Sequence, residues 1–411
     1  MTRYRIILIL FVMALIGSVS THRAIYLSLA AALFGLLALS VLWAHLSIRW
    51  MRLSRRSLAR VGQVGQMLEE EFALTNSGIL PKLWVEVQDE SDLPNHYASR
   101  ALSWLHGKNW RGWRVRTLCT ARGRFRLGPV KLTSGDPLGV YQRTRTLPTF
   151  NNLLVYPATY DLPRFPLRST FVPGGEAIRK RAQHTTTNAA GVRDYVNGDS
   201  LNRIHWPLSA RRNKLTVKEF ELDPTSDYWI FLDMQRDAQA ALSFSTESLD
   251  DNPSYMLPPS TEEYAVSLAA SVARHFIREG RTVGFLAYAG QRQIVQPDRG
   301  ERQQNKIFET LAVINSGGVV PFDRVVRSEG THLARGSTVV AISSSPAASW
   351  GAAAAQLNRN GSRVVAIVID RATFGATGVS ARMDDVTTAL VQGGVITRTV
   401  KFGDGFAEAL S

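Results

Sequence analysis

Residues 191–221 hold the densest group of side chains that could do chemistry. They read GVRDYVNGDSLNRIHWPLSARRNKLTVKEFE, with charged, aromatic and hydroxyl groups in close succession. Arginine and carboxylate side chains form strong ion pairs, histidine exchanges a proton near neutral pH, and tryptophan is frequent in binding surfaces. The candidate site residues of this signature segment are Arg193, Asp194, Tyr195, Gly198, Asp199, His205, Trp206, Ser209, Arg211 and Glu219.

Three interpretations of the signature segment place its charged groups differently. In the first, Arg193, Asp199, His205, Trp206 and Arg211 form a binding surface. In the second, the arginines and carboxylates pair with one another in a buried network that clamps two domains together. In the third, Asp199, His205 and Arg211 belong to an unrecognised enzyme site, which requires them to converge in a concave pocket.

A second candidate lies farther along the chain, where an apolar run ends. Asp233 follows Tyr228–Leu232 directly, and Asp237 comes four residues later. Ligands gather at the carboxyl ends of the strands in doubly wound sheets, and Mg²⁺ prefers oxygen ligands. Asp233 and Asp237 are therefore candidate Mg²⁺ ligands. The alternative is that Asp233 caps a loop while Asp237 is solvated.

The motifs of several enzyme classes are missing from the sequence. There is no G-x-x-x-x-G-K-[ST] phosphate loop and no G-x-G-x-x-G, G-x-S-x-G or H-E-x-x-H motif. The eight histidines are scattered, and the single cysteine, Cys119, falls in an expected strand. The sequence therefore predicts no enzyme, and no cofactor apart from Mg²⁺ at the site just described.

The signature segment resembles that of the domain-of-unknown-function-58 family. From Arg193 it reads R-D-Y-x-x-G-D-S-x-x-x-I-H-W-x-x-S-A-R-x-x-x-L-x-V-K-E-F-E. Three upstream segments, 122–129, 134–139 and 154–157, also resemble the family's β region. Together with two apolar amino-terminal segments, the resemblance extends over nearly the whole chain.

The resemblance implies a membrane-anchored bacterial or archaeal protein whose carboxy-terminal part is similar to a von Willebrand factor A domain. Genes of the family commonly neighbour those of MoxR-type AAA+ ATPases, which implies such an ATPase as a partner. No enzymatic activity is established for the family. This chain departs from the A-domain metal motif D-x-S-x-S, because Gln235 and Asp237 replace the serines and Ser343–Ser345 replace a later acid.

Two apolar segments would hold these candidates at a bilayer. Ile25–Trp43 contains no charged residue, and at about 1.5 Å per residue it nearly spans a hydrocarbon core of about 30 Å. Ile6–Val19 is shorter, and we interpret it as the first span of a hairpin that turns at Ser20–Arg23. The alternative for this segment is a signal-peptide core with small residues at Ser18 and Ser20.

Arginines near these spans predict the orientation. The first 60 residues contain eight arginines and no acid, which supplies +8 of the net charge of +14. Five of the eight follow the second span, so the soluble part should face the cytoplasm of a multi-pass cell-membrane protein. The remaining +6 is spread over 351 residues and predicts no nucleic-acid partner.

The pattern along the chain predicts a multi-domain protein. After a transmembrane hairpin and its basic juxtamembrane segment at 1–60, short apolar runs at 61–160 predict an antiparallel, immunoglobulin-like β-sandwich. Residues 161–225 form a connector that carries the signature segment. From 226 to 411, Val- and Ile-rich runs alternate with helical patterns, which predicts a doubly wound α/β domain.

These features predict an uncharacterised, membrane-tethered adaptor or scaffold that faces the cytoplasm. Its expected partner is a MoxR-type ATPase that acts in the maturation of other proteins. One alternative is a metal-dependent binding module that uses Asp233 and Asp237. A further alternative is an enzyme with an unrecognised site within residues 193–219.

Overall fold

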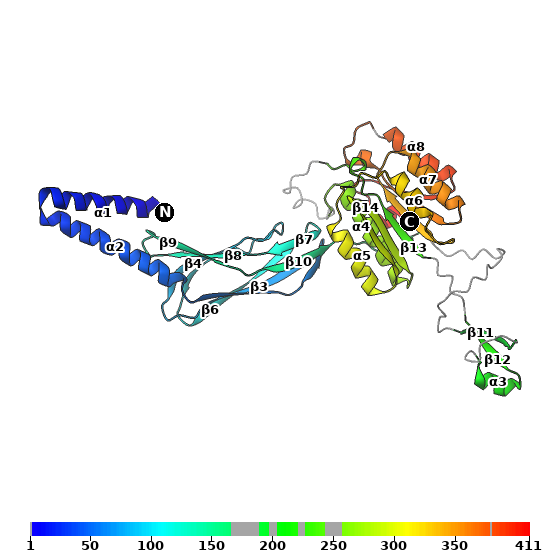
Figure 1. The fold of residues 1–411 in the computed structure, drawn as a ribbon, viewed down its shortest axis with the longest axis horizontal. Helices are drawn as coiled ribbons and strands as arrows, with labels where there is room; N and C mark the ends of the chain where they lie inside the picture. Colours follow the sequence, from blue (N-terminus) through cyan, green and yellow to red (C-terminus); the bar gives the residue numbers. More distant parts are fainter. Residues whose placement is uncertain (1, 166–188, 197–203, 221–226, 243–256, 379) are drawn as a thin grey trace. The chain divides into compact units, whose positions relative to one another are not determined.

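A computed structural model describes residues 2–165, 189–196, 204–220, 227–242, 257–378 and 380–411 (Figure 1). The chain forms two compact units. The first comprises Met1–Thr159, Leu242–Ala270 and Ile307–Asn315, and the second comprises Tyr160–Ala241, Ser271–Lys306 and Ser316–Ser411. Most of the expected 161–225 connector lies outside the described residues.

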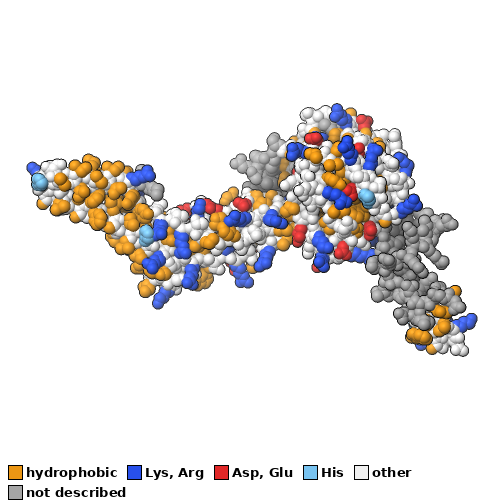
Figure 2. Space-filling model, in the orientation of Figure 1, with side chains coloured by type: hydrophobic (Ala, Val, Ile, Leu, Met, Phe, Trp, Pro, Cys, Tyr) orange, Lys and Arg blue, Asp and Glu red, His pale blue; other side chains and the backbone are white. Residues whose placement is uncertain are grey.

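Two helices begin the first unit, α1 at Thr2–Thr21 and α2 at Ala24–Ile48. Both are apolar on all sides, so hydrophobic side chains cover the hairpin in Figure 2. The two helices contact each other, with the Phe11 and Phe34 rings 6.0 Å apart. Each helix is long and apolar enough to span a membrane.

The β-sandwich consists of two antiparallel sheets with a common core. One sheet has the order β1-β3-β6 and the other β5-β4-β8-β9. The strands are β1 Met51–Ser57, β3 Met67–Asn76, β4 Lys82–Asp89, β5 Arg100–Leu105, β6 Asn109–Leu118, β8 Val130–Gly135 and β9 Gln142–Leu147. Alternate residues of both sheets point inward, and Trp113 stacks on Phe72 at 5.3 Å in the core.

A small third sheet, in the order β2-β10-β7, extends this unit. Its strands are β2 Val61–Gln63, β7 Gly123–Leu127 and β10 Asn151–Tyr156. The sequence analysis placed residues 51–57 in a juxtamembrane segment, whereas the structure places them in β1, which pairs with β3 along its whole length. The alternating pattern of β1 is weak because five of its seven residues are arginine or serine.

The second helix is attached directly to the sandwich. The Lys82 ammonium donates a hydrogen bond to the Leu46 carbonyl in the last turn of α2, where carbonyls lack helical partners. The Ser40 hydroxyl lies 3.4 Å from the Asp136 carboxylate. Asp136 also accepts hydrogen bonds from the backbone N–H groups of Leu138 and Tyr141. Asp136, in the loop between β8 and β9, therefore helps to fix α2 to these two strands.

The second unit contains a six-stranded sheet in the order β15-β14-β13-β16-β17-β18. Every strand pair is parallel except β14 with β15. The strands are β13 Tyr228–Leu232, β14 Val283–Ala289, β15 Gln291–Asp298, β16 Thr338–Ser343, β17 Arg363–Ile369 and β18 Ile396–Val400. This arrangement confirms the predicted α/β character, and all five residues of β13 are buried.

The strands are connected by α4 Thr261–Arg278, α5 Glu301–Val313, α6 Phe322–Gly330, α7 Ala348–Arg359 and α8 Ser380–Gln392, and the short helix α9 Phe406–Ala409 follows β18. Two 3₁₀ turns, η2 Arg236–Ala238 and η4 Arg371–Phe374, follow β13 and β17. Helices α6, α7 and α8 share a core with alternate strand residues such as Trp229 and Phe231, so they cover one face of the sheet. Strand β14 lies on one side of β13 and strand β16 on its other side. The carboxyl end of β13 is therefore the topological switch point of the sheet.

Candidate functional site

The signature segment folds as a small module of β11 Ala189–Asp194, α3 Trp206–Arg212 and β12 Thr216–Phe220. The two strands pair antiparallel, with Arg193 opposite Val217. His205 caps the helix, because its Nδ1 accepts a hydrogen bond from the Leu208 N–H at 3.2 Å. The Ser209 hydroxyl accepts a hydrogen bond from the Thr216 N–H at 2.9 Å. Both side chains therefore hold α3 against β12.

The signature module exposes several apolar side chains. Among its described side chains, the buried ones are Ile204, Ser209, Thr216 and Val217. Trp206 is 64% exposed, and Val192, Val196 and Leu215 are also exposed. Three cationic residues, Arg211, Arg212 and Lys214, are exposed close to them in the sequence. The module thus presents a large aromatic ring and positive charge to its surroundings.

The other seven predicted signature residues separate into three groups. Asp194 and Arg211 are exposed and Tyr195 is partly buried, so these members do not form a solvent-excluded cluster. Arg193 and Glu219 lie in the paired strands β11 and β12, where the structure describes their backbone. Gly198 and Asp199 lie outside the described residues, and the proposed convergence of Asp199 with His205 and Arg211 therefore stays a prediction.

Asp233 lies at the carboxyl end of β13, next to the switch point, and is 2% exposed. Its Oδ2 accepts a hydrogen bond from the Ser343 hydroxyl at 2.6 Å, and its Oδ1 accepts one from the Gln235 N–H at 3.0 Å. Burial raises the pKa of Asp233 to about 6, and these two hydrogen bonds act in the opposite direction. The carboxylate therefore connects the end of β13 to the end of β16.

Further hydrogen bonds fix the loop that follows β13. The Ser344 hydroxyl donates to the Ala238 carbonyl at 2.9 Å. The Gln239 side-chain amide donates to the Asp233 carbonyl at 3.0 Å, and Arg371 donates to the Asp237 carbonyl at 2.9 Å. The loop containing η2 is thus held by residues that follow β16 and β17.

This arrangement fits a structural carboxylate better than a Mg²⁺ site. Both oxygens of Asp233 already accept hydrogen bonds from protein donors. Asp237, the second predicted ligand, has an exposed side chain. Among the described residues, no group of three or more His, Cys, Asp or Glu side chains is placed to hold a metal ion. No function proposed for this chain therefore depends on a bound cation.

The sequence analysis missed a buried ion network in the sandwich. Arg55 makes two hydrogen bonds to the Glu70 carboxylate, at 3.0 and 2.9 Å, and one to Asp89 at 3.0 Å. His96 Nε2 lies 3.0 Å from Asp89 and 3.3 Å from Glu70. All four side chains are at most 2% exposed.

Strand alternation was the signal that could have revealed this network. Glu70 lies between Leu68 and Phe72 on the inward face of β3, and Asp89 continues the inward series of Val85 and Val87. Burial raises the pKa of Asp89, but hydrogen bonds from His96 and Ser91 and the charge of Arg55 outweigh it and leave the pKa lowered. Because solvent and substrate are excluded, the network is structural.

The upstream motif at 122–129 also has a structural role within the first unit. Arg122 is almost fully buried and donates to the Glu262 carboxylate at 2.8 Å, and it also pairs with Glu263. It donates in addition to the carbonyls of Leu311 and Ile314, at 3.1 and 2.7 Å. One arginine thus binds the start of α4 and the residues that end α5.

Residues 191–372 match a family described as "Protein of unknown function DUF58". The matched region begins in β11 and ends in η4, so it includes the signature module and β13 to β17. The family resemblance deduced from the signature segment is confirmed over this region. The description of the family assigns no activity.

A relative with a similar sequence is the uncharacterized protein YeaD of Bacillus subtilis (strain 168). It is 26% identical over 212 residues, which are 51% of this chain and 47% of the relative. This chain therefore spans about half the length of the curated relative that it matches.

Two solved structures show weaker similarity. The conserved hypothetical protein BatB from Bacteroides thetaiotaomicron is 15% identical, covers 43% of this chain and 90% of its own, and has a TM-score of 0.28. The CARDB domain of the PF1109 protein from Pyrococcus furiosus was solved in complex with di-metal ions. It is 14% identical, covers 26% of this chain and 86% of its own, and has a TM-score of 0.20. Neither score is high enough to support an argument about this chain.

Proposed function

We propose that this chain is a membrane-tethered, non-enzymatic adaptor that uses the signature module to bind a protein partner. The observation that carries the proposal is that Trp206 is 64% exposed on the surface of the signature module. Tryptophan is enriched among the residues that dominate binding energies. A two-stranded hairpin is at best marginally stable by itself, so a partner that covers these apolar side chains would stabilise the module.

The charge of the module indicates the character of the partner surface. Arg211, Arg212 and Lys214 are exposed within eight residues of Trp206. An aromatic anchor with surrounding cations favours a partner that offers an apolar pocket with an acidic rim. The cations would steer the encounter, while burial of the ring would determine how long the complex lasts.

We propose that the partner is a MoxR-type AAA+ ATPase and that the process is maturation of other proteins. This assignment rests on the resemblance of the signature segment to the family whose genes neighbour those of such ATPases. The same resemblance supports a von Willebrand factor A-like character for the sheet of the second unit. The two amino-terminal helices would then hold the assembly at the cell membrane, with the soluble part in the cytoplasm.

The test is a pull-down of the full chain, solubilised in detergent, from a cell extract supplied with ATP or with ADP. We expect the wild type to recover a MoxR-type ATPase. Trp206→Ala should reduce the recovery at least tenfold, since removing such an anchor typically costs 2 kcal/mol or more. Trp104→Ala is the matched control, because Trp104 is 60% exposed but lies on β5 of the sandwich.

Two results would contradict different parts of the proposal. If no ATPase is recovered with either nucleotide, the partner is wrong. If the Trp104→Ala and Trp206→Ala variants lose recovery equally, the partner does not bind through the signature module.

A further inference from the structure

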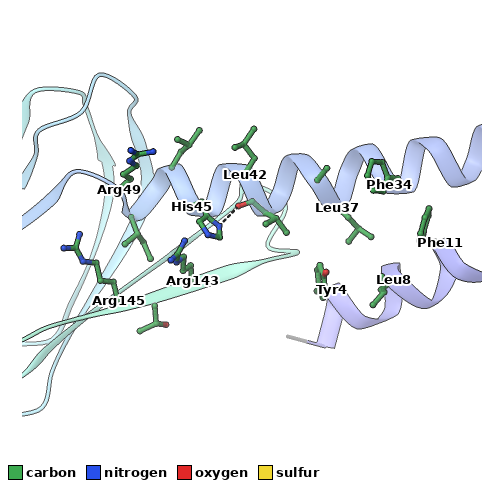
Figure 3. Close-up of a pocket in the computed structure, with 15 residues that line it drawn as sticks. Tyr4, Leu8, Phe11, Phe34, Leu37, Leu42, His45, Arg49, Arg143 and Arg145 are labelled. Atoms are coloured by element: carbon green, nitrogen blue, oxygen red, sulfur yellow. Dashed lines mark hydrogen bonds between the residues drawn. The ribbon is translucent and has the colours of Figure 1, made fainter.

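A groove of about 960 Å³ lies between the helical hairpin and strand β9, within the first unit (Figure 3). This helix–strand groove is lined at one end by Leu8, Phe11, Phe34 and Leu37 and at the other end by Arg143 and Arg145. Its volume is at the upper end of the roughly 300–1,000 Å³ of ordinary ligand pockets.

One end of the groove is apolar. Leu8 and Phe11 of α1 and Phe34 and Leu37 of α2 point toward one another in Figure 3. Phe34 is 61% exposed although it lies in the middle of an apolar helix. This end of the groove offers hydrocarbon and aromatic surface that suits an acyl chain.

The other end of the groove is cationic. Arg143 and Arg145 lie on the edge strand β9. Their cross-strand partners on β8 are Ser134 and Leu132, neither of which is acidic. Arg49 follows the last residue of α2, and its guanidinium lies over the Trp50 ring at 4.8 Å. The carboxylate of Asp136, in the loop before β9, is directed to Ser40 and to two backbone N–H groups. The arginine end is therefore suited to an anion from outside the protein.

Exposed aromatic and aliphatic side chains mark the same end of the sandwich. Trp50 and Ile79 are 43% and 82% exposed, and the Ser77 N–H donates to the Trp50 carbonyl. Trp110, which is 63% exposed, pairs with Thr75 at the end of β3. Tryptophan is enriched at membrane–water interfaces. If the two helices span a bilayer, these residues and the cationic end of the groove lie at the level of its headgroups.

We propose that the helix–strand groove binds one anionic phospholipid. The phosphate pairs with Arg143 and Arg145, whose guanidinium groups match phosphate oxygens bidentately. An acyl chain lies along Leu37, Phe34 and Phe11 toward the middle of the bilayer. This inference rests on the two helices being membrane spans, and it is independent of the protein partner.

Native mass spectrometry of the full chain, released from detergent micelles, tests the proposal. Titration with dioleoyl phosphatidylglycerol should give one retained lipid at concentrations where dioleoyl phosphatidylcholine gives none. Arg143→Gln with Arg145→Gln should weaken phosphatidylglycerol binding about tenfold or more, because two charge-assisted contacts are lost. Arg100→Gln with Arg111→Gln removes the same charge from exposed positions on β5 and β6 and should leave binding unchanged.

A second pair of variants tests the apolar end. Ala38→Phe fills the groove and should weaken phosphatidylglycerol binding, whereas Ala32→Phe adds the same ring elsewhere on α2 and should have no effect. Glycerol phosphate, which has the headgroup anion without acyl chains, should not compete at equal concentration. Competition by glycerol phosphate would instead show a site for a free phosphate.

The outcomes separate this proposal from the proposed adaptor function. Equal binding of the two lipids, or equal loss in the Arg100/Arg111 and Arg143/Arg145 variants, overturns the lipid site. If the chain is extracted from membranes at alkaline pH, the tether itself fails. If the chain is retained and the lipid result is negative, only the groove assignment is wrong.

Discussion

At the scale of single residues, several side chains that looked reactive act as anchors for the backbone. His205 caps α3, Ser209 holds that helix to β12, and Asp233 joins the ends of β13 and β16. Trp206 differs, because its ring is exposed. The charged and hydroxyl groups therefore position the surfaces, and the aromatic residue is the better candidate for recognition.

Asp233→Asn should change how stability depends on pH. The pKa of Asp233 is raised from 3.8 to about 6 in the folded chain, so the folded state binds the proton more tightly than the unfolded state. The stabilisation from this proton is complete below pH 3.8 and is lost as the pH rises through 6. From pH 4 to pH 8 the free energy of unfolding of the variant should rise by about 2–3 kcal/mol relative to that of the wild type, as measured by denaturant unfolding.

Asp237→Asn is the control for this experiment, since the side chain of Asp237 is exposed. It should follow the wild-type pH profile. If Asp233→Asn also follows the wild-type pH profile, the pKa of Asp233 is ordinary and this prediction is wrong.

At the scale of secondary-structure elements, charged residues on inward-facing strand positions tie the sandwich together. Arg55 of β1 joins Glu70 of β3 and Asp89 of β4, which are parts of different sheets. The Arg55 guanidinium also lies 5.0 Å from the Phe72 ring. A strand that resembles a basic membrane-flanking segment in sequence is therefore a structural part of the sandwich.

Arg55→Met should strongly destabilise the sandwich. It removes the cation from between two buried carboxylates, which typically costs about 3–5 kcal/mol. Arg114→Met is the matched control on the same sheet, because Arg114 pairs with Glu71 and its side chain is 70% exposed. That surface pair should contribute at most about 1 kcal/mol. Thermal and denaturant unfolding measure both variants, and equal losses would contradict a special role for the buried network.

At the scale of the whole molecule, the chain combines two units of different architecture, the first of which begins with an apolar hairpin. The hairpin is bonded to the sandwich through Ser40 and Leu46, so a surface of the sandwich lies next to the bilayer if the helices span it. Arg55 is buried in the sandwich, which leaves Arg49, Arg52, Arg56 and Arg60 as solvent-accessible charges after α2. The predicted cytoplasmic orientation therefore rests on four arginines against one in the connecting turn.

Cysteine labelling in intact cells tests this orientation. The single native cysteine, Cys119, is 1% exposed, and burial raises the pKa of its thiol, so it should react slowly. A membrane-impermeant maleimide should label Ser20→Cys, an exposed position at the end of α1 next to the hairpin turn, without lysis. It should label Ser54→Cys, an exposed position on β1, only after lysis. Labelling of Ser54→Cys in intact cells would reverse the orientation.

The sequence by itself determined the features that depend on neighbouring residues. The uncharged run Ile25–Trp43 predicts part of α2, and the apolar runs Tyr228–Leu232 and Thr338–Ser343 coincide with β13 and β16. Local patterns of this kind succeed because each helix or strand buries residues at a period fixed by its own backbone. The edge strands β9 and β15 were missed, because their exposed polar residues carry little such pattern.

Only the tertiary structure decided which distant groups meet. Asp233 and Ser343 are 110 residues apart, and their hydrogen bond depends on β13 pairing directly with β16. The helix–strand groove combines residues of α1 and α2 with Arg143 and Arg145, which lie about a hundred residues farther along the chain. Such contacts follow from strand order and helix packing rather than from local periodicity, because they are formed between elements and not within them.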